Sequence, residues 1–427
     1  NHIGHRTVVK NHVFISSHCV SNRPSIVYLR SNTLPVTFGT VTDKSFMPMA
    51  KLNVIMNDDL TMAGETATYK RPDEDIKAFR QSILEWYDTH ARILPWRARP
   101  YEQPDPYHVW LSEVMLQQTV VAAVIPYFQK FVDKWPTVTD LANAHNDDVM
   151  AAWAGLGYYA RARNLHKCAQ VVAYELGGKF PNNQKDLKAL PGIGDYTSAA
   201  ITAIAFNKQS TVVDGNIERV MSRLYAITTP LPDSKAEIKS YAETLSDCSA
   251  DQRPGDYAQA LMDIGAGVCI PKSPRCGICP VSNNCLGRKQ RIAADLPYKV
   301  KKSPKPSKHG NIYLITNADG QILLERRPDT GLLGGMLAFP TSEWVDHKQT
   351  VTHPEHFENA ATMGKNVTIN HVFTHFSLKL KGFRLDLHEK ITNSSDHYVW
   401  VSRDDILNAG LPTLFKKFAK LVIENET

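Results

Sequence analysis

Apolar residues recur at helical spacing along most of the chain before residue 290. From Asp73 onward, Ile76, Phe79, Ile83 and Trp86 fall on one face of a helix. Further helices are predicted over 106–115, 121–135, 141–155, 161–176, 196–206, 217–226, 235–248 and 256–268. Glycine and proline fill the gaps between these runs, as is typical of turns. We therefore predict one mainly α unit over residues 71–295, divided into two helical lobes.

The pattern changes to strand spacing near the C-terminus. Residues 312–316, an Asp319-Gly320 turn and residues 322–325 predict a β-hairpin. Apolar residues alternate over 376–387 with a change of phase at Gly382, which predicts a β-bulge. A strand over 398–401 and a helix over 412–423 complete an α+β domain predicted over residues 311–427.

Composition and charge narrow the class of protein. The chain has 427 residues, 43% hydrophobic and 22% charged, which excludes wholesale disorder or a fibre. No apolar stretch approaches the ~20 residues of a membrane helix, so no membrane partner is expected. The net charge is +6, yet residues 1–42 carry +4 and residues 296–310 carry +5. The rest is slightly acidic, so a nucleic-acid partner cannot be inferred from the net charge.

The two basic segments lie outside the predicted domains. Residues 296–310 hold five lysines and three prolines without an acid, which predicts an extended, solvated linker. Residues 1–70 are predicted to be a disordered leader. The leader is rich in serine and poor in acids, which also matches an organelle transit peptide, so organelle targeting stays open.

Four of the seven cysteines form a compact cluster. They are spaced Cys269-x6-Cys276-x2-Cys279-x5-Cys285. One tight pair with two looser arms suits a cubane [4Fe-4S] cluster, whereas a structural zinc site more often shows two C-x2-C pairs. Such a cluster implies a reducing compartment. We expect the protein in the cytoplasm of a bacterium.

The cysteine loop and two further motifs resemble those of a known protein family. The cysteine loop resembles that of the helix-hairpin-helix DNA glycosylases, the endonuclease III superfamily. Leu190-Pro-Gly-Ile-Gly194 resembles its hairpin, in which Gly192 and Gly194 would present backbone N–H groups to a DNA phosphate. The segment WLSEVMLQQT, ending at Thr119, resembles the adenine-specific MutY branch.

The resemblance assigns the catalytic residues. Glu113 would protonate a purine ring nitrogen so that neutral adenine leaves. Asp214 would face the sugar and stabilise the charge that develops as the glycosidic bond breaks, as well as capping a helix. Asn216 lies in the same motif. Tyr196 stands where bifunctional members carry a Schiff-base lysine, so we expect a monofunctional enzyme in which Tyr196 supports Asp214 or the sugar.

The resemblance also assigns residues to DNA and to the base. Such an enzyme has to flip the adenine out of the duplex, because a stacked adenine hides its glycosidic bond. Residues expected to wedge into the base stack or contact the opposite strand are Leu156, Tyr158, Gln118 and Thr119. Residues expected to line the adenine pocket are Arg92, Trp96, Leu116 and Gln259. Arg161 and Arg163 are expected to form a local phosphate-binding patch.

The C-terminal domain resembles the Nudix-like domain of the same family. It lacks the glutamate-rich helix that a catalytic Nudix hydrolase needs for magnesium, so we expect a reader domain. His371-Val-Phe-Thr-His375 resembles the family's Phe-Ser-His loop, which implies that Phe373, Thr374 and His375 check for 8-oxoguanine. Threonine keeps the hydroxyl of serine but adds a methyl group.

The predicted protein is thus a two-lobed helix-hairpin-helix glycosylase with an iron–sulfur loop, followed by a Nudix-like domain. It is expected to be a monomer that removes adenine mispaired with 8-oxoguanine or guanine in double-stranded DNA. One alternative is an endonuclease III-like glycosylase and lyase acting on oxidised pyrimidines. Another is a non-catalytic DNA-binding protein that uses the cluster as a redox sensor.

Overall fold

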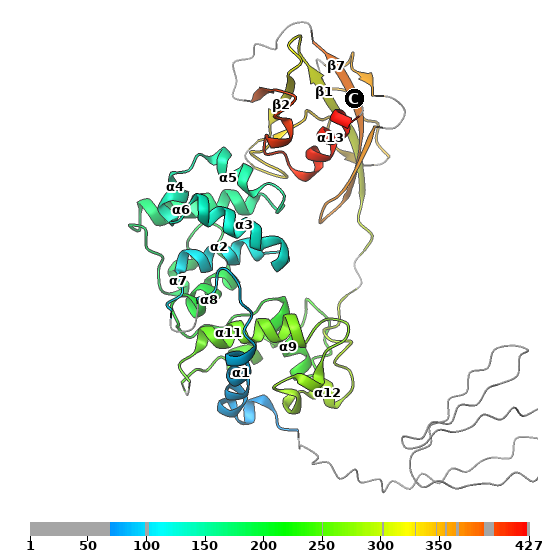
Figure 1. Cartoon of the computed structure of the whole chain (residues 1–427). Helices are drawn as coiled ribbons and strands as arrows, with labels where there is room; N and C mark the ends of the chain where they lie inside the picture. The colour runs from blue at the N-terminus through cyan, green and yellow to red at the C-terminus, as the bar shows by residue number, and fades with distance from the viewer. Residues whose placement is uncertain are drawn as a thin grey trace, which may run out of the picture. The chain divides into compact units, whose positions relative to one another are not determined.

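The structure is a computed structural model (Figure 1). It describes residues 69–98, 102–249, 251–300, 303–328, 330–346, 348–354, 357–363, 367–387 and 397–424. The leader predicted over residues 1–70 therefore lies outside the described residues, apart from Tyr69 and Lys70. Among the described helices, none is long and apolar enough to cross a membrane.

Residues before 290 fold into helices packed around one continuous hydrophobic core. The helices are α1 (Ile76–His90), α2 (Pro106–Leu116), α3 (Val121–Lys134), α4 (Val138–Asn143), α5 (Asn146–Trp153), α6 (Ala160–Tyr174), α7 (Gln184–Lys188), α8 (Asp195–Ile204), α9 (Gly215–Leu224), α10 (Lys235–Thr244), α11 (Pro254–Asp263) and α12 (Leu286–Lys289). A π-helical turn, Ile264–Val268, continues α11. In Figure 1, α2 to α8 form one group and α1 with α9, α11 and α12 forms another. The two predicted lobes thus share one core.

Most predicted helices are present, and one is divided. The run predicted over 141–155 is interrupted at Ala144-His145, where both residues have extended backbone and the His145 ring accepts a hydrogen bond from Asp147 N. Asp105 starts α2, its carboxylate accepting from Tyr107 N at 2.7 Å, with Pro106 in the first turn. This start places residues 110–116 of the WLSEVMLQQT segment on α2, and Gln117, Gln118 and Thr119 follow the helix.

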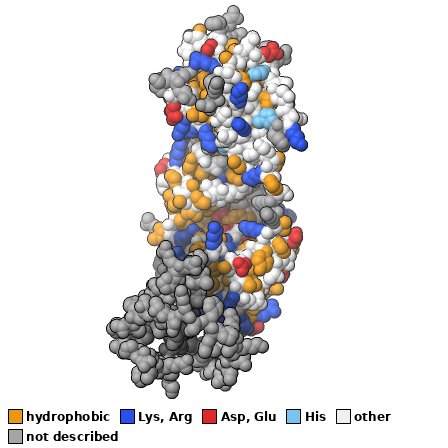
Figure 2. Space-filling view, turned by 90° about the vertical axis from the view of Figure 1, so that its right-hand side faces the viewer, with side chains coloured by type: hydrophobic (Ala, Val, Ile, Leu, Met, Phe, Trp, Pro, Cys, Tyr) orange, Lys and Arg blue, Asp and Glu red, His pale blue; other side chains and the backbone are white. Residues whose placement is uncertain are grey.

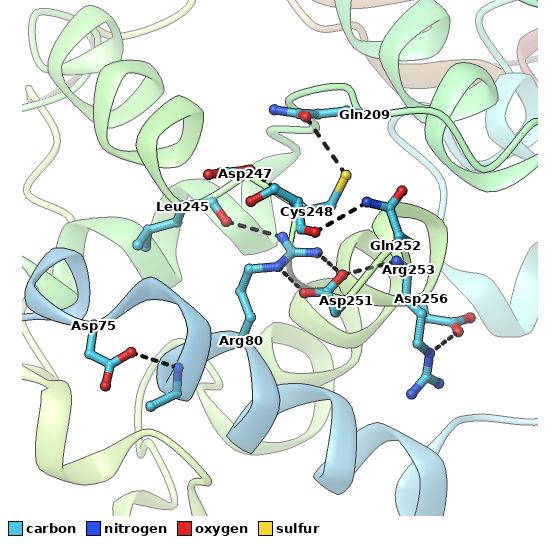
Figure 3. A network of polar contacts seen from close by, with 12 residues as sticks. Asp75, Arg80, Gln209, Leu245, Asp247, Cys248, Asp251, Gln252, Arg253 and Asp256 are labelled. Atoms are coloured by element: carbon cyan, nitrogen blue, oxygen red, sulfur yellow. Dashed lines mark hydrogen bonds and ion pairs between the residues drawn. The ribbon is translucent and has the colours of Figure 1, made fainter.

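A buried arginine holds α1 against the segment that joins α10 to α11 (Figure 3). Arg80 is 1% exposed and its guanidinium binds both oxygens of Asp251, at 2.5 and 2.9 Å. It also donates to the carbonyl of Leu245 at 3.1 Å and lies 3.8 Å from the centre of the Tyr257 ring. Because a buried cation needs such partners, this network fixes where α1 docks.

The C-terminal domain is built on a mixed sheet. Its described strands are β1 (Ser307–Thr316), β2 (Ile322–Arg326), β3 (Leu337–Ala338), β4 (Val345–Asp346), β5 (Ala361–Thr362), β6 (Thr368–Val372), β7 (Ser377–Asp386) and β8 (Tyr398–Val401), followed by α13 (Thr413–Glu424). The main order is β3-β2-β1-β7-β5, and β1 and β7 run parallel. The predicted β1–β2 hairpin is confirmed, with Thr316 opposite Ile322. Strand β1 begins at Ser307, inside the segment predicted as a linker.

The bulge predicted at Gly382 is wrong. Strand β7 pairs with β1 without interruption, and Gly382 lies opposite Ile312. The phase changes because the two halves of β7 face different cores: Leu380 packs with α13 on one face, and Phe383 belongs to a second cluster. Glycine is needed because a Cβ there would lie 2.6 Å from Val367.

Candidate active site

Glu113 is a buried carboxylic acid in the middle of an apolar helix. It lies on α2, is 5% exposed, and has buried residues on both sides in the chain. Burial raises the pKa of Glu113 to about 7; the nearby charge of Asp214 adds to this, and a hydrogen bond from Tyr196 and the charge of Arg97 oppose it. A carboxyl group of this pKa can hold a proton near neutral pH and give it up.

Tyr196 contacts the acid and not the cap of the next helix. Its hydroxyl donates to Glu113 Oε2 at 2.6 Å. The predicted hydrogen bond from Tyr196 to Asp214 is wrong, since the bond goes to Glu113. The reason is the helix packing: α8 contacts α2, which brings residues 196 and 113 together. The alternative, a contact of Tyr196 with the sugar, stays a prediction.

Asp214 caps α9 at the same end of the site. Its Oδ1 accepts from Asn216 N at 3.0 Å and from Ile217 N at 2.7 Å, and its Oδ2 accepts from the Asn216 amide at 2.9 Å. Burial raises the pKa of Asp214, and the hydrogen bonds from Ile217 and Asn216 oppose that rise. The helix cap thus fixes the carboxylate in one orientation beside Glu113.

A bridge of hydrogen bonds links Asp214 to the cysteine loop. Arg219 on α9 donates to Asn216 Oδ1 at 2.9 Å and to the carbonyls of Gly265 and Cys269 at 2.6 and 2.8 Å. Asn216 in turn holds Asp214. Sequence reasoning missed Arg219, since an arginine one helical turn after a cap shows no pattern that distinguishes it.

The four cysteines line one small hollow, together with Arg223, Val268 and Pro274. Among the described residues, no three His, Cys, Asp or Glu side chains come together as a site for a single metal ion. A four-iron cluster holds its thiolates farther apart, so the hollow and its donors fit such a group. Burial raises the pKa of the Cys279 thiol to about 12, so the thiolates need the positive charge that iron supplies. The bound cluster would cross-link the loop that receives Arg219.

Two arginines share a buried aspartate, Asp263, and the charge of one of them, Arg97, acts on Glu113. Asp263 is 2% exposed and accepts from Arg92 Nε at 2.6 Å and from both Nη atoms of Arg97 at 2.7 and 2.8 Å. Burial raises the pKa of Asp263, and the arginine hydrogen bonds outweigh it, so the net pKa is lowered. Arg92, predicted to line the adenine pocket, is thus anchored by Asp263. Asp263 was missed, although a lone charge in the apolar run LMDIG signals a buried ion pair.

Of the other residues predicted for the adenine pocket, one is buried and two are partly exposed. Trp96 is 7% exposed and packs edge-on against Phe128, with ring centres 5.4 Å apart. Leu116 is half-buried at the end of α2. Gln259 donates to Gly255 O within its own helix at 3.3 Å.

Gln118 and Tyr158 are the exposed tips of two turns. Both have left-handed backbone, with φ of 59° and 47°, which is uncommon for residues other than glycine. Tyr158 is 46% exposed, whereas Leu156 is only 7% exposed because it packs into the core. Of the two predicted wedge residues, only Tyr158 is therefore available to enter a base stack in this conformation. Thr119 is half-buried.

The two arginines of the predicted phosphate-binding patch donate hydrogen bonds to protein groups. The guanidinium of Arg161 donates to main-chain carbonyls of α2 and of the turn before Tyr158. Arg163 donates to the carbonyl of Gly334 in the C-terminal domain. Both side chains hold protein segments together, which sequence alone could not distinguish from an exposed charge.

The hairpin between α7 and α8 leaves backbone N–H groups open. Gly192 needs glycine, since its φ is +76° and a Cβ would lie 2.7 Å from Asn164. Gly194, with φ of −96°, is the N-cap of α8 without a side-chain cap, and a Cβ there would meet nothing. The protein itself does not require glycine at 194, and the open space suits an approaching anion.

The predicted reader loop joins β6 to β7. Phe373 packs against Trp344 and Phe376, with ring centres 5.8 and 4.9 Å away, while Thr374 and His375 are exposed. The Thr374 hydroxyl lies 3.0 Å from the Tyr158 hydroxyl, so the loop meets the tip of the helical unit.

Comparisons with known proteins agree with this arrangement. Residues 111–246 match the HhH-GPD superfamily of base excision DNA repair proteins, residues 269–285 the iron–sulfur binding domain of endonuclease III, and residues 311–421 the NUDIX domain. The adenine DNA glycosylase of Homo sapiens is 33% identical over 84% of this chain and 77% of its own length. That of Buchnera aphidicola subsp. Schizaphis graminum is 30% identical over 81% of this chain and 99% of its own length. A solved thermostable thymine-DNA glycosylase is 30% identical, covers 51% of this chain and 98% of its own, and has a TM-score of 0.45.

The helical unit, its hairpin and its cysteine loop define a DNA glycosylase of the HhH-GPD superfamily followed by a Nudix-like domain, as predicted. The relatives that are 30–33% identical over most of the chain allow a family within this superfamily to be assigned. The chain belongs to the adenine DNA glycosylase family. It is an enzyme that hydrolyses N-glycosidic bonds in DNA during base excision repair, and it carries a [4Fe-4S] cluster. The lyase and redox-sensor alternatives are not favoured.

Proposed function

We propose that this enzyme, acting as a monomer, excises adenine paired with 8-oxoguanine or guanine and leaves an abasic site. Glu113 is the general acid and Asp214 stabilises the sugar. The observation that carries this proposal is the buried Glu113 with a pKa of about 7, beside the capped Asp214.

In the proposed reaction Glu113 gives its proton to a ring nitrogen of the flipped adenine. The C1′–N bond then breaks, its electron pair goes to the base, and neutral adenine leaves. Positive charge develops on the sugar, which the fixed Asp214 carboxylate stabilises. The deprotonated Glu113 then takes a proton from the water that adds to C1′. Tyr196 has no amine, so a Schiff base cannot form at that position.

Adenine release from a Glu113→Gln protein tests this mechanism. The amide cannot donate the proton, so the single-turnover rate on an adenine:8-oxoguanine duplex should fall by about 10²–10⁴-fold. Glu175, directly after α6, is exposed, so Glu175→Gln is the control and should keep the wild-type rate. Undiminished release would remove Glu113 from the mechanism, and strong borohydride trapping of the wild-type protein on DNA would overturn the monofunctional proposal.

The mispair preference is proposed from the reader loop. Thr374 carries an exposed hydroxyl and lies against Tyr158, where the base opposite the extruded adenine would pass. A hydroxyl there can bond a group that 8-oxoguanine has and guanine lacks.

A Thr374→Ala protein separates the two substrates. Loss of one hydrogen bond should reduce the rate preference for 8-oxoguanine over guanine duplexes by about tenfold, with the guanine rate little changed. Thr352→Ala, at an exposed position of the same domain, is the control. An unchanged preference would show that Thr374 does not read the opposite base.

A further inference from the structure

Arg161 caps the helix that carries Glu113. Its Nη1 donates to the carbonyls of Val114 and Met115, each at 2.9 Å. These are among the last carbonyls of α2, which lack partners within the helix. Val114 directly follows Glu113, so the guanidinium fixes the backbone next to the acid.

The other side of the same guanidinium holds the turns that carry the exposed tips. Its Nη2 donates to the carbonyls of Leu156 and Gly157, at 3.1 and 3.3 Å, and to Thr119 Oγ1 at 3.2 Å. Gly157 and Tyr158 both have left-handed backbone, so this turn needs an outside anchor to keep one shape.

No ion pair neutralises Arg161 within the described residues. Burial lowers the pKa of Arg161 to about 10, and Tyr158 opposes this effect. The guanidinium lies 5.1 Å from the Trp153 ring centre and 5.6 Å from that of Tyr158. Its Nε is buried without a hydrogen-bond partner. Burying an unpaired cation costs free energy. The Nη atoms of Arg161 donate only to the end of α2 with Thr119 and to the turn before Tyr158.

We propose that Arg161 is a positioning residue that couples entry of Tyr158 into the base stack to the placement of Glu113. Movement of the turn before Tyr158 as the tyrosine inserts is transmitted through one rigid, planar group to the end of α2. This inference rests on the proposed role of Glu113 as the acid. A lysine at 161 would keep the charge, but its single ammonium group could not donate at the same time to the end of α2 and to the turn before Tyr158.

Arg161→Gln and Arg161→Lys test the coupling in the full chain. Each is compared with Lys167→Gln, which removes an exposed charge from the same helix. The readouts are base extrusion, followed by 2-aminopurine fluorescence in a mispaired duplex, and the single-turnover rate of adenine release. We expect both substitutions at 161 to reduce extrusion and to lower the rate by about 10²-fold, the cost of a small misplacement of a catalytic group. Lys167→Gln should match wild type in both.

Three results would overturn the proposal. One is wild-type extrusion and rate in Arg161→Gln, and the second is full recovery in Arg161→Lys, which would mean that charge alone matters. The third is weaker binding to intact duplex with a smaller salt dependence, which would make Arg161 a phosphate ligand. If Arg161→Gln does not fold, Arg161→Lys still tests the proposal.

Glu113→Gln, measured in the same assays, should lose adenine release but keep base extrusion. If Glu113→Gln keeps adenine release, the proposed function fails, while the extrusion result for Arg161 still stands.

Discussion

At the scale of single residues, the pKa of Glu113 decides when the enzyme works. Glu113 must be protonated, so the single-turnover rate should fall as pH rises through about 7. The rate should also fall at acid pH, where the Asp214 carboxylate takes up a proton and loses the charge that stabilises the sugar. The Tyr196 hydrogen bond stabilises the charged carboxylate, so Tyr196→Phe should raise the pKa of Glu113 and move the fall to higher pH. A rate–pH profile of both proteins checks this, and a shift to lower pH would contradict it.

The same shift should appear in the stability of the protein. The pKa of Glu113 is higher in the folded than in the unfolded state, so the folded state holds its proton more tightly. Stability is then lost as pH rises from the unfolded value of 4.5 to about 7, and the loss is complete above that. Glu113→Gln should therefore be more stable than wild type at pH 8, by about 1–3 kcal/mol, and not at pH 4. Urea unfolding at the two values measures the difference.

Asp214 combines a structural and a chemical task that two substitutions can separate. Asparagine keeps the oxygen that accepts from Asn216 N and Ile217 N but removes the charge. Asp214→Asn should keep the two backbone bonds of the cap and lose the bond from the Asn216 amide, so its stability should fall less than that of Asp214→Ala, and its rate should fall by about 10²-fold or more. Asp214→Ala should lose the rate and also about 1 kcal/mol of stability, because the cap is gone. Thermal unfolding and single-turnover assays of both variants measure the two effects separately. Equal stability of Asp214→Asn and Asp214→Ala would show that the cap contributes little.

At the scale of elements, a close approach between two helices positions Asp214. Gly265, in the π-helical turn, lies so near α9 that a Cβ would be 2.5 Å from Asn216 Cβ and 3.1 Å from its Cα. Gly265→Ala should push the start of α9 outward and lower the rate by about 10²-fold. Gly267, in the same turn, has nothing within 4 Å of an added Cβ, so Gly267→Ala is the matched control and should be neutral. Equal rates in the two variants would contradict the role of this contact.

Elements with strong local signals were predictable, and those set by distant contacts were not. The helical periodicity, the Asp319-Gly320 turn and the four-cysteine spacing each depend on neighbours in the chain, and all three are present. The bulge at Gly382 was wrong because local alternation cannot show which core a strand faces. The Tyr196–Glu113 bond and the burial of Leu156 depend on helices packed from far along the chain. The same limit concealed Arg219 and Asp263, whose partners are up to 171 residues away.

At the scale of the whole molecule, the excess positive charge lies in residues 1–42 and 296–310, whereas DNA is expected to bind at the hairpin between α7 and α8. Among the described residues on the face drawn in Figure 2, Lys and Arg side chains are spread among other residues and form no continuous patch. Two of the five linker lysines contact the C-terminal domain: Lys305 donates to Phe373 O at 2.9 Å, and Lys308 lies 5.6 Å from the Phe376 ring centre. Arg161 and Arg163 are also engaged with protein groups. The open backbone N–H groups at Gly192 and Gly194 remain as the expected phosphate contacts.

Binding to DNA should therefore depend only moderately on salt. Each phosphate that a cation neutralises contributes about −0.9 to the slope of log K against log salt, whereas a backbone N–H group binds a phosphate without adding a cation. We therefore expect a slope shallower than the roughly −5 to −9 of proteins that neutralise about 6–10 phosphates. Changing Lys299, Lys301 and Lys302 together to glutamine should leave that slope nearly unchanged, and so should removal of residues 1–42. Fluorescence anisotropy with an intact duplex between about 50 and 200 mM salt measures it. A wild-type slope near −10 that the lysine substitutions reduce by about three would instead place the linker on the phosphate backbone.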